Sequence, residues 1–282
     1  MNNKLWNKLP WFNLTFCLFI ILWGAWVRLS GSGAGCGDHW PLCNGNVLPV
    51  NPSLKTLTEL IHRLTSGIFG ITITLSFVHS YRTRLTNNSY FKASLFALIF
   101  TIIEALIGAV LVKKGLVVKN SSGLRAFVMS VHLINTLMLL YYITQTCIFV
   151  KGHAVLSKVK KTQLITYLFF FAVGASGAIA ALGNTLFPET SLVEGIMKDF
   201  SPLSHFLIRL RIIHPILATC LFILILNSNT HKFVKGLAII SVIWGGINLL
   251  LLAPNYGALL HLFLAKALFI AFSYDEIKQR MS

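Results

Sequence analysis

The sequence predicts an all-α membrane protein with eight transmembrane helices, arranged as two pseudo-symmetric four-helix bundles. Three observations support this fold class. Of the 282 residues, 55% are apolar and only 11% are charged, whereas soluble domains have about 25% charged residues. Eight apolar segments are each long enough to cross a bilayer, which takes about 20 residues. Histidines recur at corresponding places in the two halves of the chain.

The eight apolar segments follow one another with polar or basic turns between them. In order, they cover residues 11–28, 58–81, 90–112, 126–150, 162–183, 203–226, 237–253 and 256–274. The first apolar run, of about 17 residues, does not fit a cleaved signal peptide, and Cys36 lies too far along the chain for a lipidation site. We therefore expect an uncleaved first helix.

The basic residues report the orientation of the chain in the membrane. The formal net charge is +16, but the basic residues are scattered over loops without the interleaved aromatic side chains of a nucleic-acid stacking platform, so we expect no nucleic-acid partner. Thirteen Lys and Arg residues fall in the loops of one side and six in those of the other. By the positive-inside rule, both termini are predicted to be cytoplasmic in a multi-pass protein of the cell membrane.

Two of the five cysteines stand apart from the others. Cys17, Cys147 and Cys220 lie inside apolar runs, which is typical of small buried hydrophobic residues. Cys36 and Cys43 bracket the stretch CGDHWPLC in the first external loop, on the oxidising side of the membrane, where thiols tend to pair. We predict a disulfide between them, and a metal site that includes His39 is the alternative.

Four histidines show the clearest pattern in the sequence. The second, fourth, sixth and eighth helices each carry one in the outer half, and the odd-numbered helices carry none; the four are His62, His132, His214 and His261. The pattern divides the chain into an N-terminal half, 1–161, which contains the external cysteine loop 30–57, and a C-terminal half, 162–282. The stretches WGAWVRLSGSG and SGAIAALGNTL, which end the first and fifth helices, also match loosely. Parallel repeats of this kind place equivalent residues at equal depth.

The two histidines of each half, which are predicted to lie at equal depth in the membrane, are suited to binding haem. A single intramembrane histidine is more often an interhelical contact, but imidazole is the usual axial ligand of haem iron, and a helix bundle can clamp a porphyrin between two of them. A copper or zinc centre needs three or four ligands. A proton relay would use acidic residues, of which the membrane interior offers mainly Glu59 and Glu104. Two haem sites are therefore predicted.

Several motifs together resemble the haem A synthase family over essentially the whole chain. They are WVRLSGSGAGCGDHWPLCNG, ELIHRLTSG, VHL in the fourth helix, RIIHP in the sixth and LLHLFLAKAL in the eighth. The resemblance implies an enzyme of cytochrome oxidase assembly, which oxidises the C8 methyl group of haem O to a formyl group by successive hydroxylations. It also implies that the active face is directed outward. Many relatives have His-Arg where this chain has His214-Pro215, and this proline is expected to loosen the sixth helix at its ligand.

The resemblance also implies roles for individual residues. His62 and His132 would ligate the substrate haem, and His214 and His261 would ligate a resident haem b. Glu59 would be catalytic, and Cys36 and Cys43 would form the external pair.

Glu59 lies three residues before His62, so the two share a helix face with Cβ atoms about 5–6 Å apart. A proton-handling role beside the substrate follows, and a first-turn acid favoured by the helix dipole is the alternative. Arg63 could hold this carboxylate or a haem propionate. The other candidate propionate partners are Arg125, Arg209 and Arg211, which could instead extend to the membrane interface.

Two other functions remain open at this point. A dihaem b-type electron-transfer cytochrome would use the same four histidines without transforming its haem, and a transporter with parallel repeats would bind no chromophore. The ELIHR motif combined with the cysteine loop favours the synthase. The partners expected for it are the haem O substrate, membrane lipid, haem O synthase and an electron donor.

Overall fold

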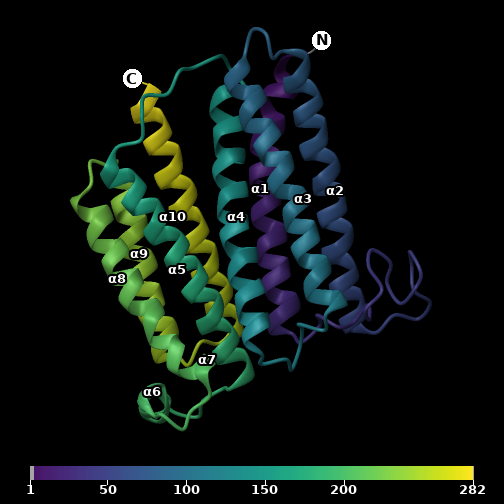
Figure 1. Ribbon diagram of the computed structural model, residues 1–282, viewed down its shortest axis with the longest axis vertical. Helices are drawn as coiled ribbons and strands as arrows, with labels where there is room; N and C mark the ends of the chain where they lie inside the picture. The colour runs from purple at the N-terminus through teal and green to yellow at the C-terminus, as the bar shows by residue number, and fades with distance from the viewer. Residues whose placement is uncertain (1–2, 282) are drawn as a thin grey trace. The chain divides into compact units, whose positions relative to one another are not determined.

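The computed structural model describes residues 3–281, whose regular secondary structure is entirely helical, with no β-strand (Figure 1). The helices are α1 (Asn3–Leu29), α2 (Leu54–Arg82), α3 (Asn88–Lys113), α4 (Gly123–Phe149), α5 (Lys161–Leu186), α6 (Leu192–Phe200), α7 (Phe206–Arg209), η1 (Leu210–Ile212), α8 (Ile213–Asn227), α9 (Lys232–Leu250) and α10 (Asn255–Met281). Eight spans of these residues are long and apolar enough to cross a membrane. The predicted all-α membrane fold is confirmed; the sides of the termini and the two-bundle arrangement stay predictions.

The helices extend beyond the apolar runs that predicted them. The second helix begins at Leu54 because Ser53 caps it, its Oγ accepting from Thr56 N at 3.2 Å. The start at 203 that was expected for the sixth helix is wrong. This span begins at Phe206 and passes through the 3₁₀ turn η1, and Ser201, a few residues before it, caps the end of α6.

The proline expected to loosen this helix lies just after the 3₁₀ turn. Pro215 has no N–H to donate to the carbonyl four residues earlier, which belongs to Arg211 in η1. The irregular turn therefore lies just before His214, which is itself in the regular helix α8, and the loosening expected at this ligand stays a prediction.

The described residues form two compact units. The first comprises 3–120, 135–157 and 277–281, and the second comprises 121–134 and 158–276. In the first unit, α1 packs on α2 and α2 on α3. The part of α4 in this unit meets α3 through Tyr142, whose ring stacks on Phe96 and Phe100 at centroid distances of 4.9 and 5.5 Å. The halves predicted to divide at residue 161 stay a prediction.

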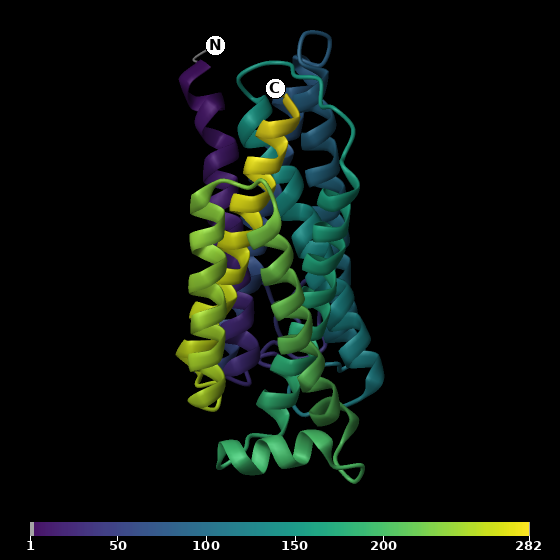
Figure 2. The same ribbon diagram turned by 90° about the vertical axis from the view of Figure 1, so that its left-hand side faces the viewer.

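In the second unit, α5 packs on α7 and α8, and α8 on α9. An aromatic cluster joins α5 to α10: Phe170 meets Phe269 and Phe272 at 5.1 and 5.3 Å. The short helix α6, which was not predicted, lies crosswise to the long helices of its own unit (Figure 2). Its sequence signal is the capping pattern Ser191-Leu-Val-Glu194, in which Ser191 Oγ accepts from Glu194 N at 3.2 Å.

Candidate functional site

The external loop after α1 is closed by a disulfide and joined to α2 by Glu59. The Sγ atoms of Cys36 and Cys43 are 2.01 Å apart, so the predicted disulfide is confirmed. The backbone N–H of Cys36 donates to Glu59 Oε2 at 2.8 Å. Both cysteines and Glu59 are buried, with Glu59 only 3% exposed. The carboxylate therefore lies directly beneath the disulfide.

Arg63 completes this junction. Its Nε and Nη2 donate to Glu59 Oε1 at 3.2 and 2.5 Å, while Nη1 donates to the carbonyl oxygens of His39 and Leu42 at 2.5 and 2.6 Å. The side chain of Arg63 is 11% exposed, so this is a largely desolvated, charge-assisted ion pair in which two guanidinium nitrogens share one carboxylate oxygen. Arg63 was predicted to hold either the Glu59 carboxylate or a haem propionate, and in the structure it contacts the carboxylate.

The alternative role for Glu59, as a first-turn acid, does not fit the structure. Because α2 begins at Leu54, Glu59 is its sixth residue, and the first turn holds no acid. The helix dipole acts within the first turn, so the contacts with Cys36 and Arg63 account for this buried carboxylate.

One turn further along α2, His62 packs against a glycine of α1. A Cβ atom built on Gly24 would lie 2.9 Å from His62 Cε1 and 3.2 Å from Nε2, closer than real Cβ contacts. The neighbouring Trp23 donates its indole N–H to the carbonyl oxygen of Thr58 at 2.9 Å. Thr58 lies four residues before His62, in the turn that carries the imidazole. A Trp-Gly pair on one helix thus fixes a histidine-bearing turn on the next.

The same arrangement recurs in the second unit around His261. A Cβ atom on Gly245 of α9 would lie 2.9 Å from His261 Cε1. Trp244 donates its indole N–H to the carbonyl oxygen of Gly257 at 3.1 Å, and Gly257 again lies four residues before the histidine. Helix pairs α1–α2 and α9–α10 therefore share one local construction, which we call the Trp-Gly clamp.

The second unit also brings two of the predicted ligands together. The imidazole rings of His214 and His261 have centroids 6.2 Å apart and planes at 82°. His214 Nδ1 lies 3.2 Å from the carbonyl oxygen of Val173; because a carbonyl oxygen only accepts, Nδ1 carries the proton and Nε2 keeps its lone pair. Gly177, aligned with Gly24 in the loose repeat, lies against this ring, with an added Cβ 3.0 Å from Cε1.

The fourth predicted ligand, His132, lies on the part of α4 that belongs to the second unit, whereas His62 belongs to the first. Its place along its helix agrees with that of the others. His62, His132, His214 and His261 are the ninth, tenth, ninth and seventh residues of their spans, counted from Leu54, Gly123, Phe206 and Asn255. At a rise of 1.5 Å per residue, these positions differ by no more than about one turn.

A half-buried acid without a predicted role lies in the first unit. Glu104 of α3 accepts from Asn135 Nδ2 and Thr136 Oγ1, both at 2.5 Å, and Asn135 also donates to the carbonyl oxygen of Phe100 at 2.9 Å. These contacts fasten α3 to α4 one turn beyond His132 in the sequence.

The remaining candidate cations differ in their surroundings. Arg125 is buried at the start of α4 and Arg209 is exposed. Arg211 donates to Asp199 Oδ1 at 2.8 Å and to Asn184 Oδ1 at 3.1 Å, and it lies 3.4 Å from Glu189. These bonds hold α6 against the start of α8. The propionate roles of all four arginines stay predictions.

The polar face of α6 carries a second ion pair. Lys198 lies 2.8 Å from both Glu189 and Glu194. The hydrogen bonds from Lys198 and Thr190 lower the pKa of the Glu194 carboxyl, and those to Glu189 and Glu194 raise the pKa of Lys198. Lys198 and Glu194 are both exposed, so the ion pair between them adds little to the stability of the fold.

The glycine and tryptophan contacts of the histidines were not predicted from the sequence. Their signal is the dipeptide Trp-Gly, which occurs at 23–24 and again at 244–245. Glycine is common in transmembrane helices whatever its surroundings, and only the packing shows which helix it faces.

The family profile described as cytochrome oxidase assembly protein, COX15-CtaA, matches residues 7–273. The chain belongs to this family. Two proteins from two strains of Thermus thermophilus, each named protoheme IX farnesyltransferase, are 35% identical to it over 297 residues. Those alignments cover 97% of this chain and 49% of each relative. The COX15-CtaA chain therefore spans about half the length of these relatives.

A second group of relatives is more similar over a shorter stretch. Proteins named heme A synthase from Bacillus cereus and Bacillus anthracis are 42% identical over 98 residues. These alignments cover 35% of the COX15-CtaA chain and 32% of each relative. The family is thus one of cytochrome oxidase assembly proteins, and part of the chain is similar to proteins named heme A synthase.

Proposed function

We propose that this protein is a haem A synthase, which oxidises the C8 methyl group of haem O to a formyl group. Two hydroxylations convert the methyl group to a hydroxymethyl group and then to a gem-diol, and loss of water leaves the aldehyde. Each hydroxylation adds one oxygen atom and removes two electrons from the carbon, so it requires an external co-substrate, either O₂ with an electron donor or water with an electron acceptor. The family match over residues 7–273 and the identity to proteins named heme A synthase support this role. The site residues below are part of the same proposal.

The observation that carries the proposal is the spacing of His214 and His261. Their ring centroids are 6.2 Å apart, close enough for both imidazoles to ligate one metal ion, because a bond from an imidazole nitrogen to a metal is about 2.0–2.1 Å long. The bare Nε2 of His214 and its Nδ1–H on Val173 also suit a ligand, because metal-bound histidines usually donate their other N–H to an acceptor.

In the C-terminal half, His214 and His261 would hold a haem b, which when bound supplies one-electron redox chemistry. Gly177 and Gly245 let the neighbouring helices approach the two rings. The carbonyl oxygen of Val173 keeps His214 in the tautomer whose Nε2 can ligate. These residues hold and orient a resident group and take no part in the substrate's covalent chemistry.

In the N-terminal half, His62 and His132 would hold the substrate haem O by its iron. Glu59 lies one turn outward of His62 and accepts hydrogen bonds from Cys36 N–H and from Arg63. Glu59 would act as the proton-handling group beside the methyl carbon that is oxidised. The disulfide loop above it excludes water from this carboxylate.

The test is to express the chain together with a haem O synthase in a host without haem A and to extract the haems. Accumulation of haem A is expected. A protein that binds haem b while haem O remains unchanged would support the dihaem electron-transfer cytochrome instead. A protein that binds no haem would refute both.

A further inference from the structure

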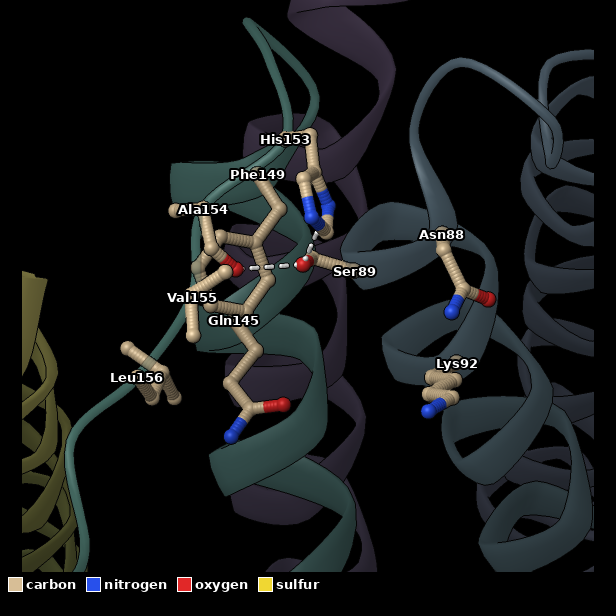
Figure 3. Close-up of a pocket in the computed structure, with 9 residues that line it drawn as sticks. All are labelled: Asn88, Ser89, Lys92, Gln145, Phe149, His153, Ala154, Val155 and Leu156. Atoms are coloured by element: carbon tan, nitrogen blue, oxygen red, sulfur yellow. Dashed lines mark hydrogen bonds between the residues drawn. The ribbon is translucent and has the colours of Figure 1, made fainter.

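We propose that a cavity at the end of the first unit opposite the disulfide loop binds the phosphate group of an anionic phospholipid. The cavity has a volume of about 360 Å³ and is lined by nine residues from the start of α3, the end of α4 and the segment after it (Figure 3). It is distinct from every histidine site described above. The proposal does not depend on the haem A synthase activity.

Two polar side chains, one from each helix, make this cavity suitable for an anion. Lys92 of α3 is exposed and brings a positive charge. Gln145 of α4 is only 9% exposed and lines the cavity. Its amide reaches the cavity surface, where its N–H groups can donate to a ligand oxygen. None of the nine lining residues is acidic.

The rim of the cavity is already organised. Ser89 Oγ donates to the carbonyl oxygen of Ala154 at 2.6 Å and lies 2.9 Å from His153 Nδ1, so it accepts from that nitrogen (Figure 3). Asn87 Nδ2 donates to the carbonyl oxygen of Phe149 at 2.7 Å. That bond occupies a terminal carbonyl of α4 that would otherwise repel an anion, and the start of α3 presents the positive end of its dipole.

Depth and surroundings indicate that the phosphate belongs to a lipid. Lys92 is four residues inside the start of α3 and Gln145 four inside the end of α4, about 6 Å from each helix end at 1.5 Å per residue. The polar headgroup layer of a bilayer is about 5–7 Å thick on each side. Phe149, Val155 and Leu156 add an apolar wall, which suits an acyl chain. The volume also exceeds what a bare ion needs and lies within the range of small-molecule sites, about 300–1,000 Å³.

The charge distribution favours an anionic lipid. By the positive-inside rule this end of α3 and α4 faces the cytoplasm, and the lysines at 151, 158, 160 and 161 follow α4 in the sequence. Basic pockets between transmembrane helices on the cytoplasmic side are typical of sites for anionic headgroups.

The test uses the full-length purified protein in detergent and compares Lys92→Gln and Gln145→Leu with Lys151→Gln, an exposed lysine just after α4 that does not line the cavity. Phosphatidylglycerol in mixed micelles should raise the unfolding temperature of the wild type and of Lys151→Gln. Lys92→Gln should bind this lipid about fivefold more weakly, since one lysine near an anionic surface has about that effect. Gln145→Leu should also lose most of the rise.

A second measurement does not depend on stability. Lipids extracted from the purified proteins are counted per protein by mass spectrometry, and Lys92→Gln should retain about fivefold less phosphatidylglycerol than Lys151→Gln. Equal retention would overturn the proposal. An equal rise with phosphatidylcholine would exclude recognition of an anion, and an equal rise with inorganic phosphate would assign the cavity to the free ion instead of a lipid.

Discussion

The surroundings of His62 and His261 share the Trp-Gly clamp but differ one turn outward. Beside His62 lie Glu59 and Arg63, both engaged with the disulfide loop. At the same offsets from His261, three before and one after, the chain has Ala258 and Leu262. The clamp thus fixes an imidazole in either half, and of these two histidines only His62 has charged groups beside it.

This difference distinguishes a site that only holds a haem from a site that also transforms it. A ligand site needs a fixed imidazole and an apolar surround, whereas oxidation of a methyl group also needs a residue that can move a proton. In the proposed N-terminal site Glu59 would be that residue, and the turn before His261 has no acid. The proposal of a substrate haem in the first half and a resident haem b in the second is based on this difference.

The largest effect is expected for the double replacement His214→Ala, His261→Ala. Both rings of the pair with centroids 6.2 Å apart are removed, so the purified protein should lose its stable haem b completely. Absorption spectra measure this loss, and circular dichroism should show unchanged helix content. Full retention of haem b in the double variant would contradict the assignment.

Glu59→Gln should abolish turnover and spare haem b. Glutamine keeps an acceptor for the N–H of Cys36 but loses the charge, and removal of a general base typically costs about 10²–10⁴-fold in rate. Extracted haems should show haem O or its hydroxylated intermediate in place of haem A. Glu104→Gln, the same change at another acid in a membrane-spanning helix of the first unit, is the matched control. A normal haem A yield in Glu59→Gln would leave Glu59 as an anchor of the loop.

Gly245→Ala and Gly24→Ala test whether the two clamps are equivalent. In each case the new Cβ would lie 2.9 Å from an imidazole carbon, and overpacking of this kind costs about 1–3 kcal/mol. Both variants should unfold at lower temperature, and Gly245→Ala alone should also weaken haem b binding. Gly246→Ala is the control, because a Cβ there meets nothing within 4 Å. Loss of haem b in Gly24→Ala as well would show that the halves are not independent.

The smallest effect is expected for Trp23→Phe and Trp244→Phe. Each removes one indole hydrogen bond to a carbonyl oxygen, at 2.9 and 3.1 Å, while it keeps much of the aromatic surface. A loss of about 0.5–1.5 kcal/mol is expected for each. Thermal unfolding followed by far-ultraviolet circular dichroism measures it. A variant as stable as the wild type would reduce the clamp to its glycine contact.

The sequence by itself determined the membrane class, the eight spans and the disulfide. These depend on composition, run length and the oxidising environment of one loop, all of which are local properties. It also identified the four histidines, because their placement on alternate helices is visible without coordinates. The sequence did not reveal α6. This helix has only nine residues and one capping pair, which is a much weaker sequence pattern than an apolar run of about 20 residues.

Only the tertiary structure decided what those residues contact. Glu59 and Cys36 are 23 residues apart in the sequence, and Trp244 and Gly257 are 13 apart, so no helical or strand period connects them. The alternation of polar and apolar residues predicts which side of a helix is buried but not which neighbour covers it. Gly245 faces an imidazole, whereas its neighbour Gly246 faces open space. This difference depends on how the helices pack, and helix packing is determined by contacts between residues far apart in the chain.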